Sequence, residues 1–137
     1  MAAGYSNTPL WKKLGVRPGD RLVLLDGPPG WAVPELPDGV VANAEHAADS
    51  DALVEVIIAF CTSLAGLGAT VASQAPRIFP AGAIWVAWPR RAAGHESDVS
   101  ENDIRAVALP LGLVDVKVAA LDHDWSGLRL VWRRENR

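Results

Sequence analysis

The chain has 137 residues, of which 50% are hydrophobic and 21% are charged, and its formal net charge is −3. These values are those of an ordinary globular protein, and we expect one domain, residues 1–137, that buries most of its apolar surface. The negative charge argues against general electrostatic binding of nucleic acid. The absence of an apolar run of roughly 18–20 residues argues against a membrane span. The single cysteine excludes an intramolecular disulfide.

The first expected elements are a short helix and a buried strand. Thr8 followed by Pro9 is typical of an N-cap and a first helical residue, and Gly15 marks the end of this helix. Residues 21–26 (Arg-Leu-Val-Leu-Leu-Asp) contain a continuous apolar run, which predicts the first buried strand.

A long loop separates this strand from the next strong strand signal. Residues 27–39 are rich in proline and glycine, so we expect mostly loop, with at most one helical turn near residues 32–36. Residues 40–42 predict a short second strand. The apolar run over residues 53–60 is typical of a central parallel strand that is covered on both faces.

Another helix and another buried strand follow. Thr62 or Ser63 is a candidate N-cap for a helix that we expect to run to about residue 75. Residues 81–88 are again continuously apolar, which predicts a buried strand that ends at Pro89. This alternation of strand and helix signals favours a parallel sheet of the α/β class.

The next helix has the clearest local signals. Ser100 and Asp103 stand at the N-cap and N3 positions of a capping box, in which Asp replaces the usual Glu. Val99 and Ile104 flank this start at the spacing of a hydrophobic staple. We expect the helix to end before Gly112.

The final segment changes to an alternating pattern. Valines alternate with charged residues over 114–118, and apolar residues alternate with Arg129 and Arg133 over 128–133. This pattern predicts an antiparallel pair with one wetter face, joined by a turn at residues 122–126. We therefore expect an α/β, Rossmann-like fold of three layers, with a mostly parallel sheet and a C-terminal antiparallel hairpin.

Several segments resemble the class I S-adenosylmethionine-dependent methyltransferases, whose last strand inserts antiparallel into the sheet. These segments are residues 16–26, 79–88 and 112–118 with the returning strand. The resemblance implies a truncated version of that fold, since the stretch between the first strand and the strand at residue 54 is too short for two further strand–helix units. It also implies an acidic ribose partner after the second strand, where this chain has Asn43 and, nearby, Glu45.

Nearly the whole chain is also similar to a family of short bacterial proteins of unknown function. The matching segments are residues 4–15 (Gly-Tyr-Ser-x-Thr-Pro-Leu-x-Lys-Lys-Leu-Gly), 88–91 (Trp-Pro-Arg-Arg) and 124–126 (Asp-Trp-Ser). This second resemblance implies a bacterial protein with the same fold, and it implies no particular activity.

The loop after the first strand departs from the methyltransferase pattern. The resemblance implies an acidic-x-Gly-x-Gly-x-Gly loop, of which Asp26, Gly27 and Gly30 remain as candidate cofactor-binding residues, with Trp31 beside them. The two residues between the glycines are prolines, which have no backbone N–H. Because such N–H groups bind anionic parts of ligands in nucleotide loops, the sequence predicts a lost or altered cofactor site.

Other residues expected beyond the carboxyl ends of the strands are candidates for a ligand crevice. They are Trp88, Arg90, Arg91, His123 and Trp125. Together with Trp31, these tryptophans beside arginines could stack on a flat ring and neutralise an anionic group. In the alternative interpretation the tryptophans fill a vacated crevice, since each buries about 150–250 Å², and the arginines are solvated.

Some polar groups carry weaker signals. Residues 122–124 (Asp-His-Asp) offer metal-compatible atoms, but a polar hairpin turn explains them and we expect no metal site. His95, Glu96 and Asp98 are more typical of a solvated loop than of a mobile acid–base group. Cys61 ends an apolar run without a basic neighbour, which indicates a buried, inert thiol.

Two functions stay open. The leading hypothesis is a non-catalytic methyltransferase-like domain, without a cofactor, that binds a small ligand or a protein partner. The alternative is a minimal S-adenosylmethionine-dependent methyltransferase that uses Asp26, Gly27 and Gly30, with Asp122 or His123 as the proton acceptor. Because the first residues lack the pattern of a signal peptide, we expect a cytoplasmic protein.

Overall fold

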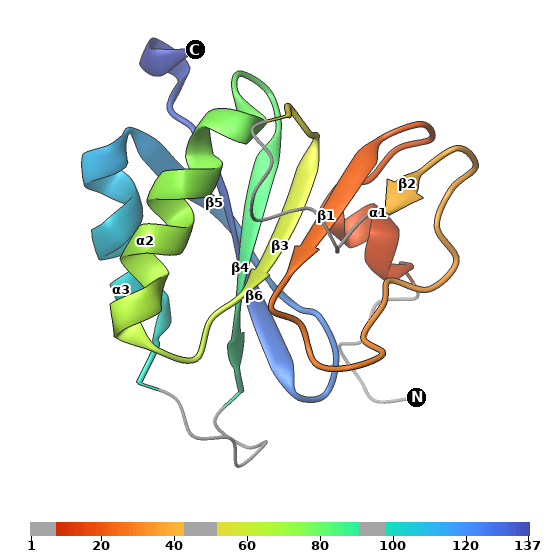
Figure 1. Ribbon diagram of the computed structural model, residues 1–137, viewed down its shortest axis with the longest axis horizontal. Helices are drawn as coiled ribbons and strands as arrows, with labels where there is room; N and C mark the ends of the chain where they lie inside the picture. Colours follow the sequence, from red (N-terminus) through yellow and green to blue (C-terminus); the bar gives the residue numbers. More distant parts are fainter. Residues whose placement is uncertain (1–7, 43–51, 91–97) are drawn as a thin grey trace.

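A six-stranded sheet lies at the centre of the computed structural model, which describes residues 8–42, 52–90 and 98–137 (Figure 1). In spatial order the strands are β2 (Val41–Ala42), β1 (Arg21–Leu25), β3 (Val56–Phe60), β4 (Ala83–Pro89), β6 (Trp125–Trp132) and β5 (Leu113–Ala120). The first four are parallel, whereas β6 runs antiparallel to both β4 and β5. The predicted mostly parallel sheet with a C-terminal antiparallel hairpin is confirmed.

Helices cover both faces of this sheet (Figure 1). α1 (Leu10–Leu14) lies on one face, and α2 (Leu64–Gln74) and α3 (Glu101–Ala108) lie on the other. Short 3-10 turns at Ala75–Ile78, Leu109–Leu111 and Arg134–Asn136 follow α2, α3 and β6. This is the three-layer arrangement that the sequence predicts. Among the described residues, no helix has the length and apolar character needed to cross a membrane.

The starts of the helices follow local signals in the sequence. Ser63 caps α2, because its Oγ accepts a hydrogen bond from the N–H of Ala65 (3.2 Å). At α3 the N–H of Asp103 donates to the Ser100 hydroxyl, and the Ser100 N–H donates to the Asp103 carboxylate at 2.8 Å. This is the predicted capping box. α1 starts one residue later than predicted, with Pro9 in the N-cap position.

Several strand boundaries differ from the predictions. β4 starts at Ala83 and includes Pro89, whereas the sequence predicts residues 81–88. β3 starts later than the apolar run, because the N–H of Val54 donates to the carbonyl oxygen of Arg77 (2.9 Å) instead of joining the sheet. The hairpin strands are longer than predicted and the turn between them is shorter, since Trp125 already belongs to β6. The predicted loop at residues 27–39 is confirmed, without a helical turn.

Apolar side chains form one cluster on each face of the sheet. Along β4, Ile84 and Val86 belong to the cluster under α2 and α3, whereas Trp85 and Ala87 belong to the cluster under α1. Trp85 is fully buried, and its indole N–H donates to the carbonyl oxygen of Leu14 at 3.0 Å. The end of α1 is therefore tied to the centre of the sheet, and this bond positions the loop that follows the helix.

Candidate functional site

The strand order places a topological switch point between β1 and β3. From these two neighbours the chain continues in opposite directions, to β2 on one side and to β4 on the other. In open α/β sheets, ligands bind beyond the carboxyl ends of the strands at such a point. We call this region the carboxyl edge and define it by residues 26–31, 60–63 and 122–125. It contains most of the predicted site residues.

Aromatic rings cover the carboxyl edge. The ring of Phe60, the last residue of β3, makes edge-to-face contacts with Trp31 and with Trp125, each with ring centres 4.9 Å apart. A side chain added at Gly27 would place its Cβ 3.1 Å from the Phe60 ring. The Phe60 ring therefore lies directly against the glycine that the methyltransferase resemblance makes a cofactor contact. Trp31 and Trp125 thus pack on one ring at this edge, and no pattern in the sequence marks Phe60 as part of it.

The loop after β1 folds into turns. The N–H of Trp31 donates to the carbonyl oxygen of Pro28 at 3.0 Å, and Gly30 adopts a left-handed φ of +76°, which glycine tolerates. Asp26 also has a positive φ, of +58°, and its side chain is exposed. Pro28 and Pro29, which lack a backbone N–H, thus lie in the middle of this loop. Asp26 is an exposed charged residue at the start of the loop.

Asp122 holds the carboxyl edge together. One carboxylate oxygen accepts hydrogen bonds from the N–H groups of Asp124 and Trp125, both at 2.8 Å. The other accepts a hydrogen bond from the indole N–H of Trp31 at 2.9 Å. This side chain is therefore engaged in structural contacts, whereas His123 is exposed. No group of three metal-ligating side chains is found in residues 8–42, 52–90 and 98–137.

The remaining crevice candidates do not converge. Trp88 packs against the cluster under α2 and α3, whereas Trp31 and Trp125 belong to the cluster under α1. The prediction that all three tryptophans share one crevice is wrong, because side chains alternate between the two faces of a strand. Arg90 supports the hairpin turn, because its backbone N–H donates to the carbonyl oxygen of Asp124 at 2.7 Å. The predicted residues Asn43, Glu45, Arg91, His95 and Glu96 lie outside the described residues.

A small cavity remains at the carboxyl edge, on the side of α2. Its volume is about 260 Å³, and its lining comprises Asp26, Phe60, Cys61, Thr62, Ser63, Gly66, Thr70 and Trp125. Burial, and to a lesser degree the charge of Asp26, raises the pKa of the Cys61 thiol to about 11. This agrees with the prediction of an inert thiol. Asp98 caps α2, because its carboxylate accepts a hydrogen bond from the N–H of Leu64 at 2.8 Å.

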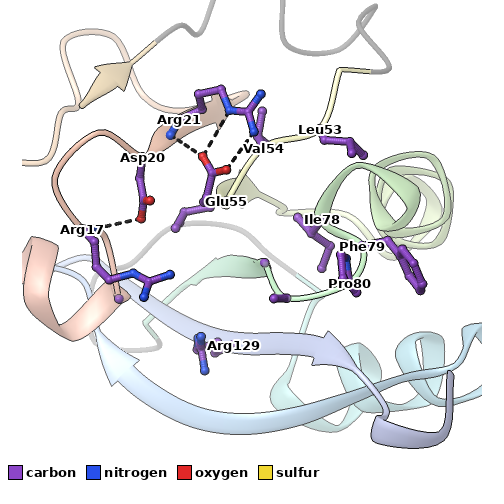
Figure 2. Close-up of a pocket in the computed structure, with 14 residues that line it drawn as sticks. Arg17, Asp20, Arg21, Leu53, Val54, Glu55, Ile78, Phe79, Pro80 and Arg129 are labelled. Atoms are coloured by element: carbon purple, nitrogen blue, oxygen red, sulfur yellow. Dashed lines mark hydrogen bonds and ion pairs between the residues drawn. The ribbon is translucent and has the colours of Figure 1, made fainter. Parts of the chain in front are cut away.

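A larger cavity, of about 500 Å³, lies at the opposite edge of the sheet, where β1, β3 and β4 begin (Figure 2). We call it the amino-edge pocket. Its polar lining residues are Arg17, Asp20, Arg21, Glu55 and Arg129, and its apolar ones include Leu53, Val54, Ile78, Phe79 and Pro80. The sequence does not predict this pocket, because the general rule for open α/β sheets places binding crevices at the carboxyl ends of the strands.

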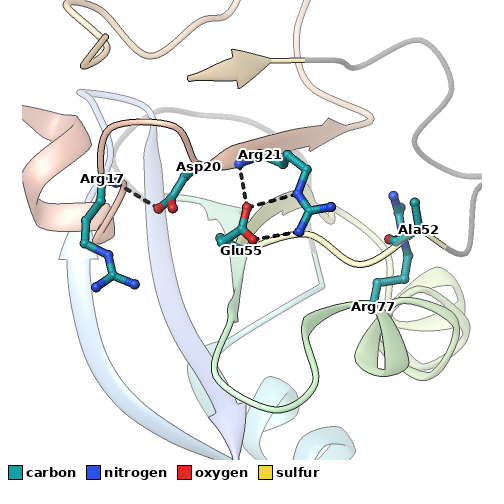
Figure 3. A network of polar contacts seen from close by, with 6 residues as sticks. All are labelled: Arg17, Asp20, Arg21, Ala52, Glu55 and Arg77. Atoms are coloured by element: carbon teal, nitrogen blue, oxygen red, sulfur yellow. Dashed lines mark hydrogen bonds and ion pairs between the residues drawn. The ribbon is translucent and has the colours of Figure 1, made fainter. Parts of the chain in front are cut away.

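An ion pair forms one wall of the amino-edge pocket (Figure 3). The guanidinium of Arg21 donates to both carboxylate oxygens of Glu55, at 3.2 and 2.8 Å, and the backbone N–H of Arg21 donates to the same carboxylate at 2.6 Å. These hydrogen bonds lower the pKa of Glu55 and raise the pKa of Arg21. Beside this pair, the carboxylate of Asp20 accepts a hydrogen bond from the backbone N–H of Arg17 at 2.8 Å.

Arg129 contributes a half-buried cation to the same pocket. Its Nε is buried without a hydrogen-bond partner, and burial lowers the pKa of its guanidinium. The alternating pattern predicts that Arg129 faces water. That prediction fails because β6 lies between β4 and β5, and the face that carries Arg129 is covered by the loop around Gly15. The position of Arg129 within an apolar run of the sequence is the one signal that could have indicated this site.

Comparison with known proteins identifies the fold. No family model matches the chain, and no match is found among curated proteins. Among solved structures, a SAM-dependent methyltransferase from Aquifex aeolicus is similar with a TM-score of 0.59 and 12% identity, over 88% of this chain and 86% of that one. Fibrillarin from Aeropyrum pernix with bound S-adenosyl-L-methionine has a TM-score of 0.53 and 16% identity, over 93% and 70%.

Magnesium protoporphyrin IX methyltransferase from Synechocystis PCC 6803 is similar in two structures, each with 10% identity. With bound SAM the TM-score is 0.58, over 85% of this chain and 71% of that one. With bound SAH it is 0.54, over 72% and 53%, so this chain matches about half of that structure's length. At sequence identities this low, the similarity shows a shared fold and nothing about activity. The chain therefore has a methyltransferase-like, Rossmann-type α/β fold.

Proposed function

We propose that this chain is a non-catalytic domain of the methyltransferase-like fold that acts by binding, and that its carboxyl edge is closed to S-adenosylmethionine. The observation that carries the proposal is the position of Phe60. Its ring lies between Trp31 and Trp125 and against Gly27, where an added Cβ would already be 3.1 Å away. A cofactor could approach Gly27 from this side only if the ring moved.

The chemistry of the loop supports the same proposal. Backbone N–H groups and close backbone approach are the means by which nucleotide loops hold their ligands. Pro28 and Pro29 supply neither, since each lacks an N–H and adds a ring. The remaining cavity of about 260 Å³ is also smaller than the roughly 300–1,000 Å³ of typical small-molecule sites.

The contacts of Asp122 and the burial of Cys61 are consistent with a binding role. Asp122, the proton acceptor under the alternative hypothesis, uses both carboxylate oxygens in hydrogen bonds to Trp31, Asp124 and Trp125. The buried thiol of Cys61, with its pKa raised to about 11, is a poor nucleophile at neutral pH. Removal of a proton by Asp122 would require breaking these hydrogen bonds.

One observation favours the alternative, a minimal S-adenosylmethionine-dependent methyltransferase. The exposed carboxylate of Asp26 borders the remaining cavity at the switch point. In this case Asp26, Gly27 and Gly30 would contact the cofactor, which would supply the methyl group. His123 would be the remaining proton acceptor, since it is exposed in the turn.

Thermal unfolding in the presence of S-adenosylmethionine or S-adenosylhomocysteine separates the two functions. A ligand at 100 times its dissociation constant stabilises a fold by about 2.7 kcal/mol, which raises the Tm of a domain of this size by roughly 9 °C. We expect no rise in Tm at millimolar concentration of either compound. A clear rise in the wild-type chain would contradict the proposal and support the methyltransferase.

A matched variant tests the cause. Replacing Pro28 and Pro29 with glycine restores the missing N–H groups but leaves the Phe60 ring in place. We expect this double variant to bind neither compound, because the ring still lies against Gly27. Binding by the double variant alone would assign the closure to the prolines and not to the ring.

A further inference from the structure

We propose that the amino-edge pocket binds a small organic anion, with a carboxylate or phosphate headgroup between Arg129 and Arg17 and an apolar part against Leu53 and Phe79. This inference deepens the proposed binding function and rests on it, since it gives that function a site and a class of ligand. The pocket lies at the opposite edge of the sheet from the switch point.

Arg129 is the central observation. It stands on an internal strand, its Nε is buried without a partner, and no hydrogen bond or ion pair joins its guanidinium to another part of the chain that the structure describes. Removing a cation from water without a compensating group is costly. A half-buried cation that faces a cavity of about 500 Å³ is therefore arranged for an anion that arrives from outside.

Arg17 supplies a second cation. Figure 2 shows its guanidinium pointing into the pocket, and within residues 8–42, 52–90 and 98–137 that guanidinium makes no hydrogen bond or ion pair. The backbone of Arg17 is held in place, because its N–H donates to Asp20 and because Trp85 anchors the preceding Leu14. Fixing this backbone lowers the entropy that binding would cost.

The acidic groups of the pocket are already engaged. Glu55 is paired with Arg21 through three hydrogen bonds, and Asp20 accepts the backbone N–H of Arg17. Among the lining residues, three guanidinium groups stand against two carboxylates, so the pocket carries one net positive charge. Guanidinium groups match the geometry of carboxylate and phosphate oxygens and can bind them through paired hydrogen bonds.

The apolar lining indicates that the ligand is more than an inorganic ion. Leu53 and Phe79 line the pocket and are 52% and 42% exposed, although both are large hydrophobic residues. An anion with a ring or a short chain would cover them. The volume of about 500 Å³ is within the range of small-molecule sites, roughly 300–1,000 Å³.

A second cavity extends the site on the other side of Arg129. Its volume is about 290 Å³, and it is lined by Pro80, Ala81, Gly82, Val116, Arg129, Val131 and Arg137. It shares Arg129 and the segment 80–82 with the amino-edge pocket. Arg129 is therefore accessible from two hollows, and Arg137 adds a further cation to the second one.

Heteronuclear NMR of the isotope-labelled chain tests the proposal with three probes of similar shape. These are phenyl phosphate, phenylacetate and the neutral phenylacetamide. We expect one or both anions to cause saturable shift changes in amides of residues 15–21, 53–56, 78–82 and 127–131, and phenylacetamide to cause none. The relative affinities of the two anions identify the headgroup. Absence of binding by both anions, or equal binding of phenylacetamide, would overturn the proposal.

Variants identify the residues that bind. We expect Arg129→Met and Arg17→Met each to raise the Kd of the anion by about tenfold or more, since a charge-assisted hydrogen bond contributes at least that factor. Arg133→Met is the matched control, because Arg133 follows the same strand and pairs with Glu135 outside the pocket. Arg129→Met should also raise the Tm of the free chain, since it removes a desolvated cation. Unchanged affinity in Arg129→Met would contradict the site.

S-adenosylhomocysteine in the same experiment keeps the two proposals apart. Saturable shifts in residues 26–31 and 60–63 would contradict the closed carboxyl edge, whatever the anions do. If neither S-adenosylhomocysteine nor either anion causes shift changes, only the proposal for the amino-edge pocket is overturned.

Discussion

The indole N–H of Trp85 donates a 3.0 Å hydrogen bond to the carbonyl oxygen of Leu14, so the largest fully buried side chain fixes the end of the first helix. Gly15 continues from this point with a left-handed φ of +81°, and the chain then leads to Arg17 at the amino-edge pocket. One bond in the core thus sets the position of a cation at the surface.

Trp85→Phe removes the donor of this bond and should lower the free energy of unfolding by about 2–4 kcal/mol, since it leaves a buried carbonyl without a partner and creates a small void. Denaturant unfolding measures the loss. Trp132→Phe is the control, because Trp132 makes a similar bond to the Ala75 carbonyl oxygen (2.9 Å) on the other face but is only half-buried. An equal or larger loss in the control would contradict this account of α1.

Asp122→Ala should destabilise the chain by about 2–3 kcal/mol, because it removes the acceptor of three hydrogen bonds at the carboxyl edge. Asp124→Ala is the neighbouring control. The Asp124 carboxylate makes no hydrogen bond in the part of the chain that the structure describes, so its loss should change stability by less than about 0.5 kcal/mol. Equal effects of the two substitutions on the Tm would show that Asp122 is an ordinary surface residue.

The Glu55–Arg21 pair predicts a dependence of stability on pH. Hydrogen bonds from Arg21 lower the pKa of Glu55 below its ordinary value of 4.5. The resulting stabilisation is present above pH 4.5 and is lost as the pH falls through the lowered pKa of the folded state. Glu55→Gln and Arg21→Met should therefore both flatten the decline of unfolding free energy below that pH. Retention of the full wild-type slope in Glu55→Gln would exclude this pair as a contributor.

The thiol of Cys61 should resist alkylation in the folded chain. Burial raises its pKa from the ordinary 9.0 to about 11, so the thiolate fraction near neutral pH falls by about a hundredfold relative to an exposed cysteine. The measurement is the rate of reaction with iodoacetamide at pH 8, folded against denatured. Similar rates in the two states would mean that the thiol is accessible.

Most of the fold could be predicted from local signals. The capping box of Ser100 and Asp103 and the Ser63 cap depend on neighbours within three residues, and both form as predicted. The apolar runs at residues 21–26 and 81–88 likewise form buried strands. Such signals are local, so a single sequence contains them.

The candidate site was harder to predict, because it depends on which strand lies beside which. Trp88 and Trp125 come from neighbouring strands, yet they belong to opposite faces, and this depends on the register between β4 and β6. Arg129 was expected to face water, and it is half-buried because β6 lies inside the sheet. The sequence predicts Phe60 only as part of an apolar strand, and its position at the carboxyl edge depends on contacts with residues far away in the chain.

The most direct test of the central claim is a crystal structure of this chain grown with millimolar S-adenosylmethionine. We predict that the space beside Gly27 contains the ring of Phe60, in contact with Trp31 and Trp125, and no cofactor. A cofactor seated against residues 26–30, with the Phe60 ring displaced, would contradict the account.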